Sequence, residues 1–186
     1  RLLNINASFN AKQSLQYLGD ITVVGGFEIK KNKIHKSFIS FFIAEVTSKV
    51  LQENEQNPLL FNFIWNTTKK LYSSEKRDPN FVLKYLLSLS LFLGFSPSID
   101  EINKPFFNLE SGEFSEKKNI PEICLDIEKS NYLKGLLRNQ EIKIPQEQRS
   151  GLLKGLLRYY KLHHYNLDNI TSHLVIETLR QWRGGG

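Results

Sequence analysis

Three apolar stripes at helical spacing, beginning near residue 33, most constrain what this chain can fold into. The first lies in HKSFISFFIAEVTSKVLQ, and NPLLFNFIWNTTKKLY and DPNFVLKYLLSLSLFLGF follow with similar patterns. Because each amphipathic helix must bury its apolar face, three in close succession predict a helical bundle. In the first helix we expect the inward face to carry Phe38, Phe41, Phe42, Val46 and Val50, and the outer face to carry Lys36, Glu45 and Lys49.

Local start and stop signals mark the second and third helices. Asn57-Pro58 and Asp78-Pro79 are typical helix starts, because the proline ring suits the first turn and the preceding polar side chain can cap it. Gly94 is expected to end the third helix, before Pro97.

The second half of the chain predicts a hairpin and three more helices. INKPFFNLESGEFSEKKNIP indicates a short β-hairpin near residues 106–115 that turns at ESGE. Further helices are expected at about 124–139, from 145, and from Thr171 or Ser172, with Ser172 as a cap. The predicted fold is therefore mainly α, a bundle of about six helices.

Residues 1–29 follow a different pattern. Leu3, Ile5, Ala7 and Phe9 alternate with polar residues, and LQYLGDITVV adds a second β-rich run. Since two strands are not stable alone, we expect them to pair with a missing segment or to lie on the other domain. We place the helical domain at 30–183 and interpret 184–186 as a tail or linker scar; a chain that starts with arginine favours a fragment.

Charge and cysteine content narrow the function. The formal net charge of +6 favours an anionic partner, which could be nucleic acid, an acidic protein tail or a membrane surface. Cys124 is the single cysteine, so an intramolecular disulfide or a cysteine-based zinc site is excluded and a buried thiol in a reducing cytosol is expected. The apolar runs are shorter than the roughly 20 residues of a membrane span.

Nothing in the sequence specifies an enzyme. His163 and His164 are adjacent and would diverge on a helix, while His35 and His173 stand alone. No HExxH, CxxC or phosphate-loop motif occurs. We therefore expect no catalytic residue, no cofactor and no metal.

Basic residues on two successive helices form the clearest functional candidate. They could form a phosphate-contacting surface, a socket for an acidic peptide beside an apolar groove, or merely a solvated face. Tyr159, Tyr160 or Tyr165 would then be available for base stacking. The candidates for DNA binding, chosen by charge placement, are Lys134, Arg138, Arg149, Lys154 and Arg158, with Lys161 nearby.

Four stretches, taken together and in order, resemble the bacterial RecO family of recombination mediators, and most of all its Bacteroidetes members. They are FIAEVTSKVLQENEQNPLLFNFIWNTTKKL (43–71), NFVLKYLLSLSLFLGFSP (80–97), FFNLESGEF (106–114) and LLRYYKLHHYNLDNITSHLVIETL (156–179).

The resemblance implies an N-terminal OB-fold followed by a helical domain. It implies a cytoplasmic, nucleoid-associated DNA repair protein that binds and anneals single-stranded DNA. It also implies binding to RecR and docking on the acidic C-terminal tail of single-stranded DNA-binding protein, which assists recombinase loading, with no membrane role. Residues 1–29 would match only the last OB-fold strands, and the segment where many members carry four zinc-binding cysteines has none here, so a metal-free hairpin is expected.

The resemblance also suggests where the acidic tail would bind. Lys84 stands where the family pattern has basic residues that hold the tail, and Phe81, Leu87 and Phe61 are candidate walls for its apolar end. In LLRYYKLHHY the resemblance implies the end of a packed helix, with Tyr160 and His163 structural and Arg158 facing outward.

Two alternatives remain open: a helical protein-interaction adaptor without nucleic-acid binding, and an enzyme that uses His163 with a carboxylate.

Overall fold

The computed structural model describes residues 2–26, 34–51, 56–118, 120–168, 170 and 172. This part of the chain is mainly α, as predicted, and none of its helices is both long and apolar enough to cross a membrane. Of the predicted last helix, only Ser172 lies within the described residues. The helices are α1 (Ile34–Val50), α2 (Pro58–Ser73), α3 (Phe81–Phe92), α4 (Ile127–Leu137) and α5 (Gln146–Leu162), and the strands are β1 (Leu2–Ser8), β2 (Tyr17–Gly25), β3 (Phe106–Phe107) and β4 (Phe114–Ser115).

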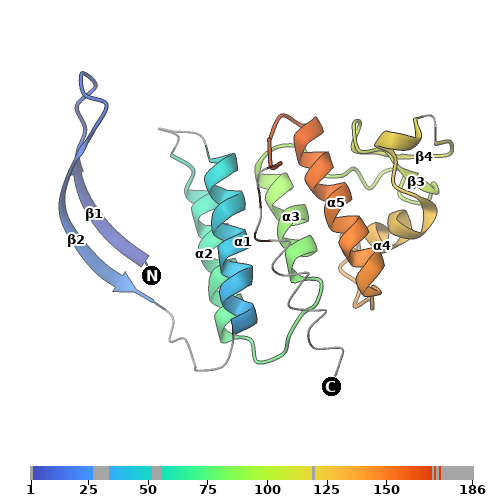
Figure 1. Cartoon of the computed structure of the whole chain (residues 1–186), viewed down its shortest axis with the longest axis horizontal. Coiled ribbons are helices and arrows are strands. Elements are labelled where there is room, and N and C mark those ends of the chain that lie inside the picture. The colour runs from blue at the N-terminus through green and yellow to red at the C-terminus, as the bar shows by residue number, and fades with distance from the viewer. Residues whose placement is uncertain are drawn as a thin grey trace.

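The helices stand side by side with α3 in the middle (Figure 1). On one side α3 packs against α2, which packs against α1, and on the other side α3 packs against α5, which contacts α4. Because α3 has neighbours on both sides, Leu83, Leu86 and Leu89 are almost fully buried. The core therefore centres on the most apolar of the predicted helices.

The predicted inward and outer faces of α1 are correct in their spacing but wrong at one position each. Phe42, Val46 and Val50 are buried, whereas Phe41 is 64% exposed because it lies beside the buried stripe. Lys36, predicted to face outward, is only 4% exposed. Its ammonium donates hydrogen bonds to the carbonyl oxygens of Tyr72 at 2.9 Å and Ser74 at 2.6 Å, at the C-terminal end of α2. A cation is favourable there because the last carbonyls of a helix have no helical partner.

The helix signals at Asn57-Pro58 and Gly94 are confirmed, whereas Asp78-Pro79 is misplaced by two residues, because the N-cap of α3 is Asn80 and Pro79 lies before the first turn. The Asn57 side chain accepts a hydrogen bond from the Leu60 N–H at 2.9 Å, and Pro58 occupies the first turn of α2. Gly94 has a φ of +83° and follows the end of α3. Helix α3 begins at Phe81, just after the Asp78-Pro79 signal.

The predicted hairpin is formed by β3 and β4, which pair antiparallel with Phe107 opposite Phe114. Both side chains are buried, and so is Cys124, as expected. The N–H of Phe107 donates to the Ser130 hydroxyl at 3.0 Å, which ties the hairpin to α4. This end of the fold therefore packs as one unit with the helices.

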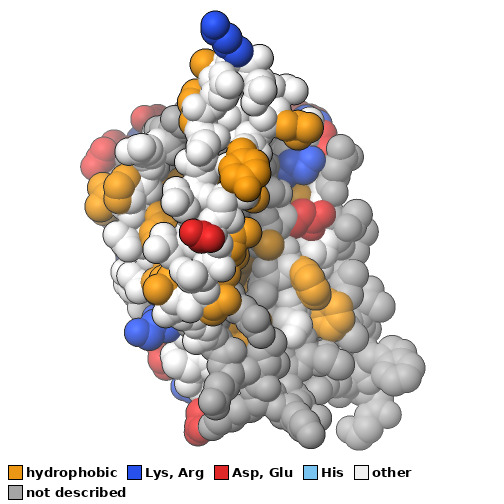
Figure 2. Space-filling model, turned by 90° about the vertical axis from the view of Figure 1, so that its left-hand side faces the viewer, with side chains coloured by type: hydrophobic (Ala, Val, Ile, Leu, Met, Phe, Trp, Pro, Cys, Tyr) orange, Lys and Arg blue, Asp and Glu red, His pale blue; other side chains and the backbone are white. Residues whose placement is uncertain are grey.

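Strands β1 and β2 form an antiparallel hairpin at one side of the helices, with Leu3 opposite Val23 and Ile5 opposite Ile21. All four of these side chains are exposed, and Figure 2 shows apolar side chains on this side of the molecule. A Cβ atom on Gly25 would lie 3.8 Å from the ring of Trp65, so the end of β2 approaches α2.

Candidate functional site

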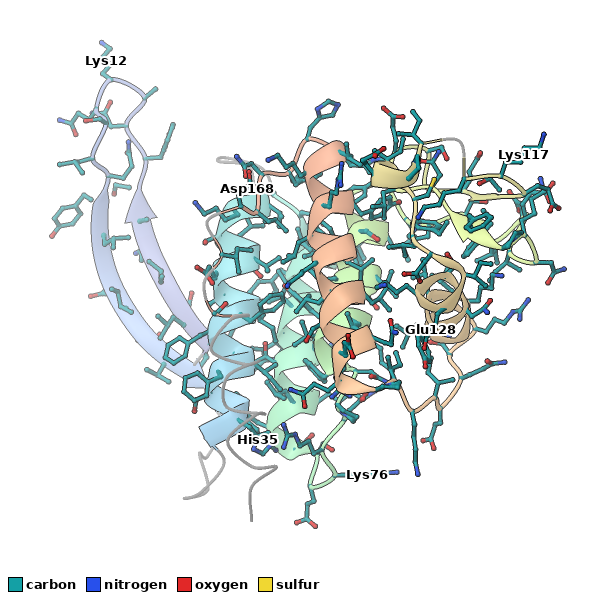
Figure 3. The ribbon with its side chains drawn as sticks, turned by 45° about the vertical axis from the view of Figure 1, so that its right-hand side comes forward. Lys12, His35, Lys76, Lys117, Glu128 and Asp168 are labelled. Carbon is teal, nitrogen blue, oxygen red and sulfur yellow. The ribbon has the colours of Figure 1, made fainter. Side chains whose placement is uncertain are left out.

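A cavity of about 210 Å³ lies at the end of the bundle where α1 and α3 begin and α2 ends. Figure 3 shows His35, at the start of α1, and Lys76, in the loop after α2, at this same end. The apolar part of its wall is made of Ile39, Phe63, Leu71, Phe81 and Tyr85, and the basic residues that line it are Lys36, Lys70, Lys76, Arg77 and Lys84. The cavity therefore joins an apolar interior to a positively charged border.

Positive charge exceeds negative charge around this cavity. Asp78 is the one acidic residue in its described lining, and its Oδ2 lies 2.8 Å from the Lys84 ammonium. Arg149, from the first turn of α5, lies near enough for the charge of the same carboxylate to act on it. The pKa of Arg149 is lowered by burial and by the neighbouring charge of Arg77, while Asp78 acts in the opposite direction. The described lining thus holds five basic residues and one carboxylate, which suits an anionic ligand.

The structure brings two of the four predicted tail-binding residues to the cavity. Lys84 and Phe81 line it, from the first turn of α3. Leu87 is half-buried and packs against the hydrophobic core, and Phe61 lies on α2 with 54% of its surface exposed. Neither Leu87 nor Phe61 is part of the cavity wall.

Sequence reasoning missed the cations that α2 and the loop after it contribute. Three cations of the cavity were not predicted, namely Lys70, Lys76 and Arg77. Lys70 is on α2 and the other two are in the loop after it, so no helical spacing connects them. The available signal was the pair Lys76-Arg77, directly before the helix start at Asp78-Pro79. A loop that connects two packed helices places its charges at the end of both.

The basic residues of α4 and α5 group mainly in pairs one helical turn apart. Lys134 and Arg138 are neighbours, since the pKa of Lys134 is lowered by burial and then by the charge of Arg138. The Lys134 ammonium lies 5.5 Å from the centre of the Phe114 ring. Lys154 and Arg158 are exposed on α5. Arg149 does not join these pairs: it is outside the described cavity lining, and the charges of Arg77 and Asp78 act on its pKa.

The predicted stacking role of two tyrosines is wrong. Tyr159 and Tyr160 are each 1% exposed, and burial raises the pKa of both phenols. Their hydroxyls donate to the backbone carbonyls of Phe95 and Leu86, so they act in the core. Tyr165 is half-buried and stacks on Phe95 with ring centres 5.3 Å apart.

His163 ends α5, as predicted, and its ring stacks on Phe95 at 4.9 Å. Burial lowers the pKa of His163, a hydrogen bond with the Leu109 backbone raises it, and the neighbouring His164 lowers it. Within the described residues, no three His, Cys, Asp or Glu side chains come together in a group that could hold a metal ion. These contacts favour a structural role for His163.

Comparison with known proteins decides the family. The family model described as "Recombination protein O C terminal" matches residues 31–168. The chain belongs to the RecO family. It is 31% identical to the DNA repair protein RecO of Christiangramia forsetii, over 87% of this chain and 69% of that protein. It is 28% identical to the DNA repair protein RecO of Azobacteroides pseudotrichonymphae, over 96% of this chain and 76% of that protein. No solved structure matches it.

The RecO match contains the whole described lining of the cavity, from His35 to Ser88, and also α4 and α5. Hairpin β1–β2 lies before the matched residues, although the alignment with the Azobacteroides RecO extends over 185 residues. The candidate site is therefore a feature of the RecO C-terminal region.

Proposed function

We propose that this RecO chain is a recombination mediator whose cavity captures the acidic C-terminal tail of single-stranded DNA-binding protein. The observation that carries the proposal is the combination of an apolar wall and a surplus of cations in one cavity. The terminal apolar side chain of the tail would pack against Phe81 and Tyr85, and its carboxylates would meet Lys84, Arg77 and their basic neighbours. The protein would act by binding and not by catalysis.

The exposed basic pairs on α4 and α5 support a second part of the proposal, which is binding of single-stranded DNA. Lys154 and Arg158 are free to contact phosphates and to release counterions from the strand. With RecR, the chain would remodel single-stranded DNA-binding protein and expose DNA for annealing or recombinase loading. Such work belongs to the cytoplasm and the nucleoid.

The domain division is part of the same proposal. We assign residues 1–29 to the last strands of an OB-fold-like domain, residues 30–183 to the helical domain and residues 184–186 to a tail or linker scar. The exposed apolar side chains of β1 and β2 support this division, because a two-stranded hairpin with such a face needs further strands to cover it.

Tail capture is tested by fluorescence anisotropy with a labelled acidic peptide that ends in Asp-Asp-Ile-Pro-Phe. We expect Lys84→Glu to weaken binding about tenfold, because it removes one cation and repels the peptide. Lys161→Glu is the matched control. Lys161 also pairs with an aspartate, Asp168, which Figure 3 shows at the opposite end of the bundle from His35. Equal loss in both variants would contradict a specific pocket.

DNA binding is tested with labelled single-stranded oligonucleotide across a salt series. We expect the double variant Lys154→Ala, Arg158→Ala to lower the slope of log affinity against log salt by about 1.4, since each phosphate contact on a single strand contributes about 0.7. The control is Lys49→Ala, Lys69→Ala, which removes two exposed lysines from α1 and α2. Peptide binding without any DNA binding would instead favour an adaptor that does not contact nucleic acid.

A further inference from the structure

Asp78 occupies an unusual position in the cavity, because it is the one carboxylate among the cations of the described lining. Two contacts hold it. Its Oδ1 accepts a hydrogen bond from the Asn80 N–H at 2.9 Å, and its Oδ2 accepts one from the Lys84 ammonium at 2.8 Å. The backbone contact fixes the carboxylate at the start of α3, where it faces the same lysine that an acidic ligand would need.

The surroundings of Asp78 have the chemistry of a carboxylate-binding site. Arg149 is close enough to Asp78 and to Arg77 for both charges to influence its pKa. Among the described residues, the Lys84 ammonium is the cation that bonds the Asp78 carboxylate, and Arg77 and Arg149 add positive charge to its surroundings. An incoming carboxylate would find the same partners that Asp78 uses, so the internal and the external anion compete.

We propose that Asp78 is a specificity-determining residue, an internal stand-in for the ligand carboxylate that must release Lys84 before an acidic tail can bind. This inference rests on the proposed function and extends it. The pair can open, because the side chains of Lys84 and Asp78 are 44% and 37% exposed and such ion pairs are weak.

The consequence is selection by the number of carboxylates on the ligand. A peptide with a single carboxylate near its apolar end gains little by replacing Asp78, because one ion pair is exchanged for another. A peptide with adjacent carboxylates can take Lys84 and also engage Arg77 and its neighbours. Asp78 thus raises the number of carboxylates that a peptide needs in order to bind.

The test measures peptide affinity of Asp78→Asn by anisotropy at low salt. Asparagine keeps an oxygen that accepts the Asn80 N–H, so the start of α3 is preserved while the charge is removed. We expect about two- to fivefold tighter binding, which is the range of a weak exposed ion pair. The gain should be larger for a peptide with one carboxylate than for one with two, and it should disappear in a Lys84→Gln background.

Asp126→Asn is the matched control, because Asp126 also accepts a backbone N–H at a helix start, from Lys129, and pairs with that lysine's ammonium. An equal gain in this variant, or an undiminished gain in the Lys84→Gln background, would overturn the inference by showing a general effect of net charge. If Asp78→Asn fails to fold by circular dichroism, Asp78→Ser replaces it, with the same expected gain.

The two proposals fail differently. Wild-type binding with no gain in Asp78→Asn would overturn the role of Asp78 and leave tail capture standing. Absence of peptide binding in both proteins would overturn tail capture and the role of Asp78 together.

Discussion

At the scale of single residues, buried polar groups hold the helices in register. Tyr160 donates from α5 to the Leu86 carbonyl of α3 at 2.6 Å, and the Tyr85 hydroxyl lies 2.8 Å from that of Thr47 on α1. Lys36 closes the end of α2 in the same manner. Each side chain buries an apolar body and places its polar tip on a fixed partner, which links neighbouring helices.

We expect the ionisation of Tyr85 to lower the free energy of unfolding at alkaline pH. Burial raises its pKa to about 12, although the hydrogen bond with Thr47 acts in the opposite direction. The unfolded chain ionises near pH 10, so the contribution of Tyr85 is complete below that pH and is lost as the pH rises through 12. Urea unfolding from pH 9 to 12 should show that Tyr85→Phe reduces this loss by about 2 kcal/mol.

The control for Tyr85→Phe is Tyr17→Phe, since Tyr17 is 75% exposed. Its removal should leave the alkaline decline of the unfolding free energy unchanged. An equal change in both variants would show that the decline comes from the ordinary titration of exposed phenols.

At the scale of elements, two glycines with positive φ lie where the backbone turns, one after α3 and one between β3 and β4. Gly94 (φ +83°) follows α3 in open space. Gly112 (φ +72°) lies in the hairpin, where a Cβ atom would come 2.9 Å from the Tyr159 hydroxyl. At Gly112 a side chain is therefore excluded both by the backbone conformation and by Tyr159 of α5. At Gly94 only the backbone conformation disfavours a side chain.

The two glycines make a matched pair of substitutions. Gly94→Ala should cost about 1 kcal/mol of unfolding free energy, from the left-handed backbone alone. Gly112→Ala should cost about 1–3 kcal/mol more, because its methyl group also displaces Tyr159 from its bond to Phe95. Urea unfolding of both variants checks this, and equal costs would mean that the Tyr159 contact adjusts freely.

At the scale of the whole molecule, the helices and the β3–β4 hairpin form one packed core, while β1–β2 stands at its side (Figure 1). Most large apolar side chains of β1 and β2 are exposed, including Leu18 at 55% and Val24 at 64%. The approach of Gly25 to Trp65 joins β2 to α2 at its end. The stability of the core therefore depends little on this hairpin.

Removal of residues 1–26 should change the unfolding free energy by less than about 1 kcal/mol, because little of the core is uncovered. Urea unfolding followed by helical circular dichroism measures it. A large loss would contradict the proposed division at residues 29 and 30.

The sequence by itself determined the elements whose causes are local. Asn57-Pro58 and Gly94 act on their own turns, the period of three to four residues defines α1 to α3, and alternation defines β1. These patterns predicted the mainly helical fold, the two N-terminal β-rich runs and the ESGE turn, because capping, backbone restriction and side-chain spacing need no distant partner. The pairing of β1 with β2 was not predicted.

Only the tertiary structure decided the cavity. Its cations come from three helices and a loop, and no spacing rule links Lys36 to Lys84. The burial of Lys36 and Tyr159 was likewise hidden, because it depends on how far each helix is rotated toward its neighbours. That rotation is set by the packing of the whole core, so polar residues at the edge of an apolar stripe acquire their role only when the helices meet.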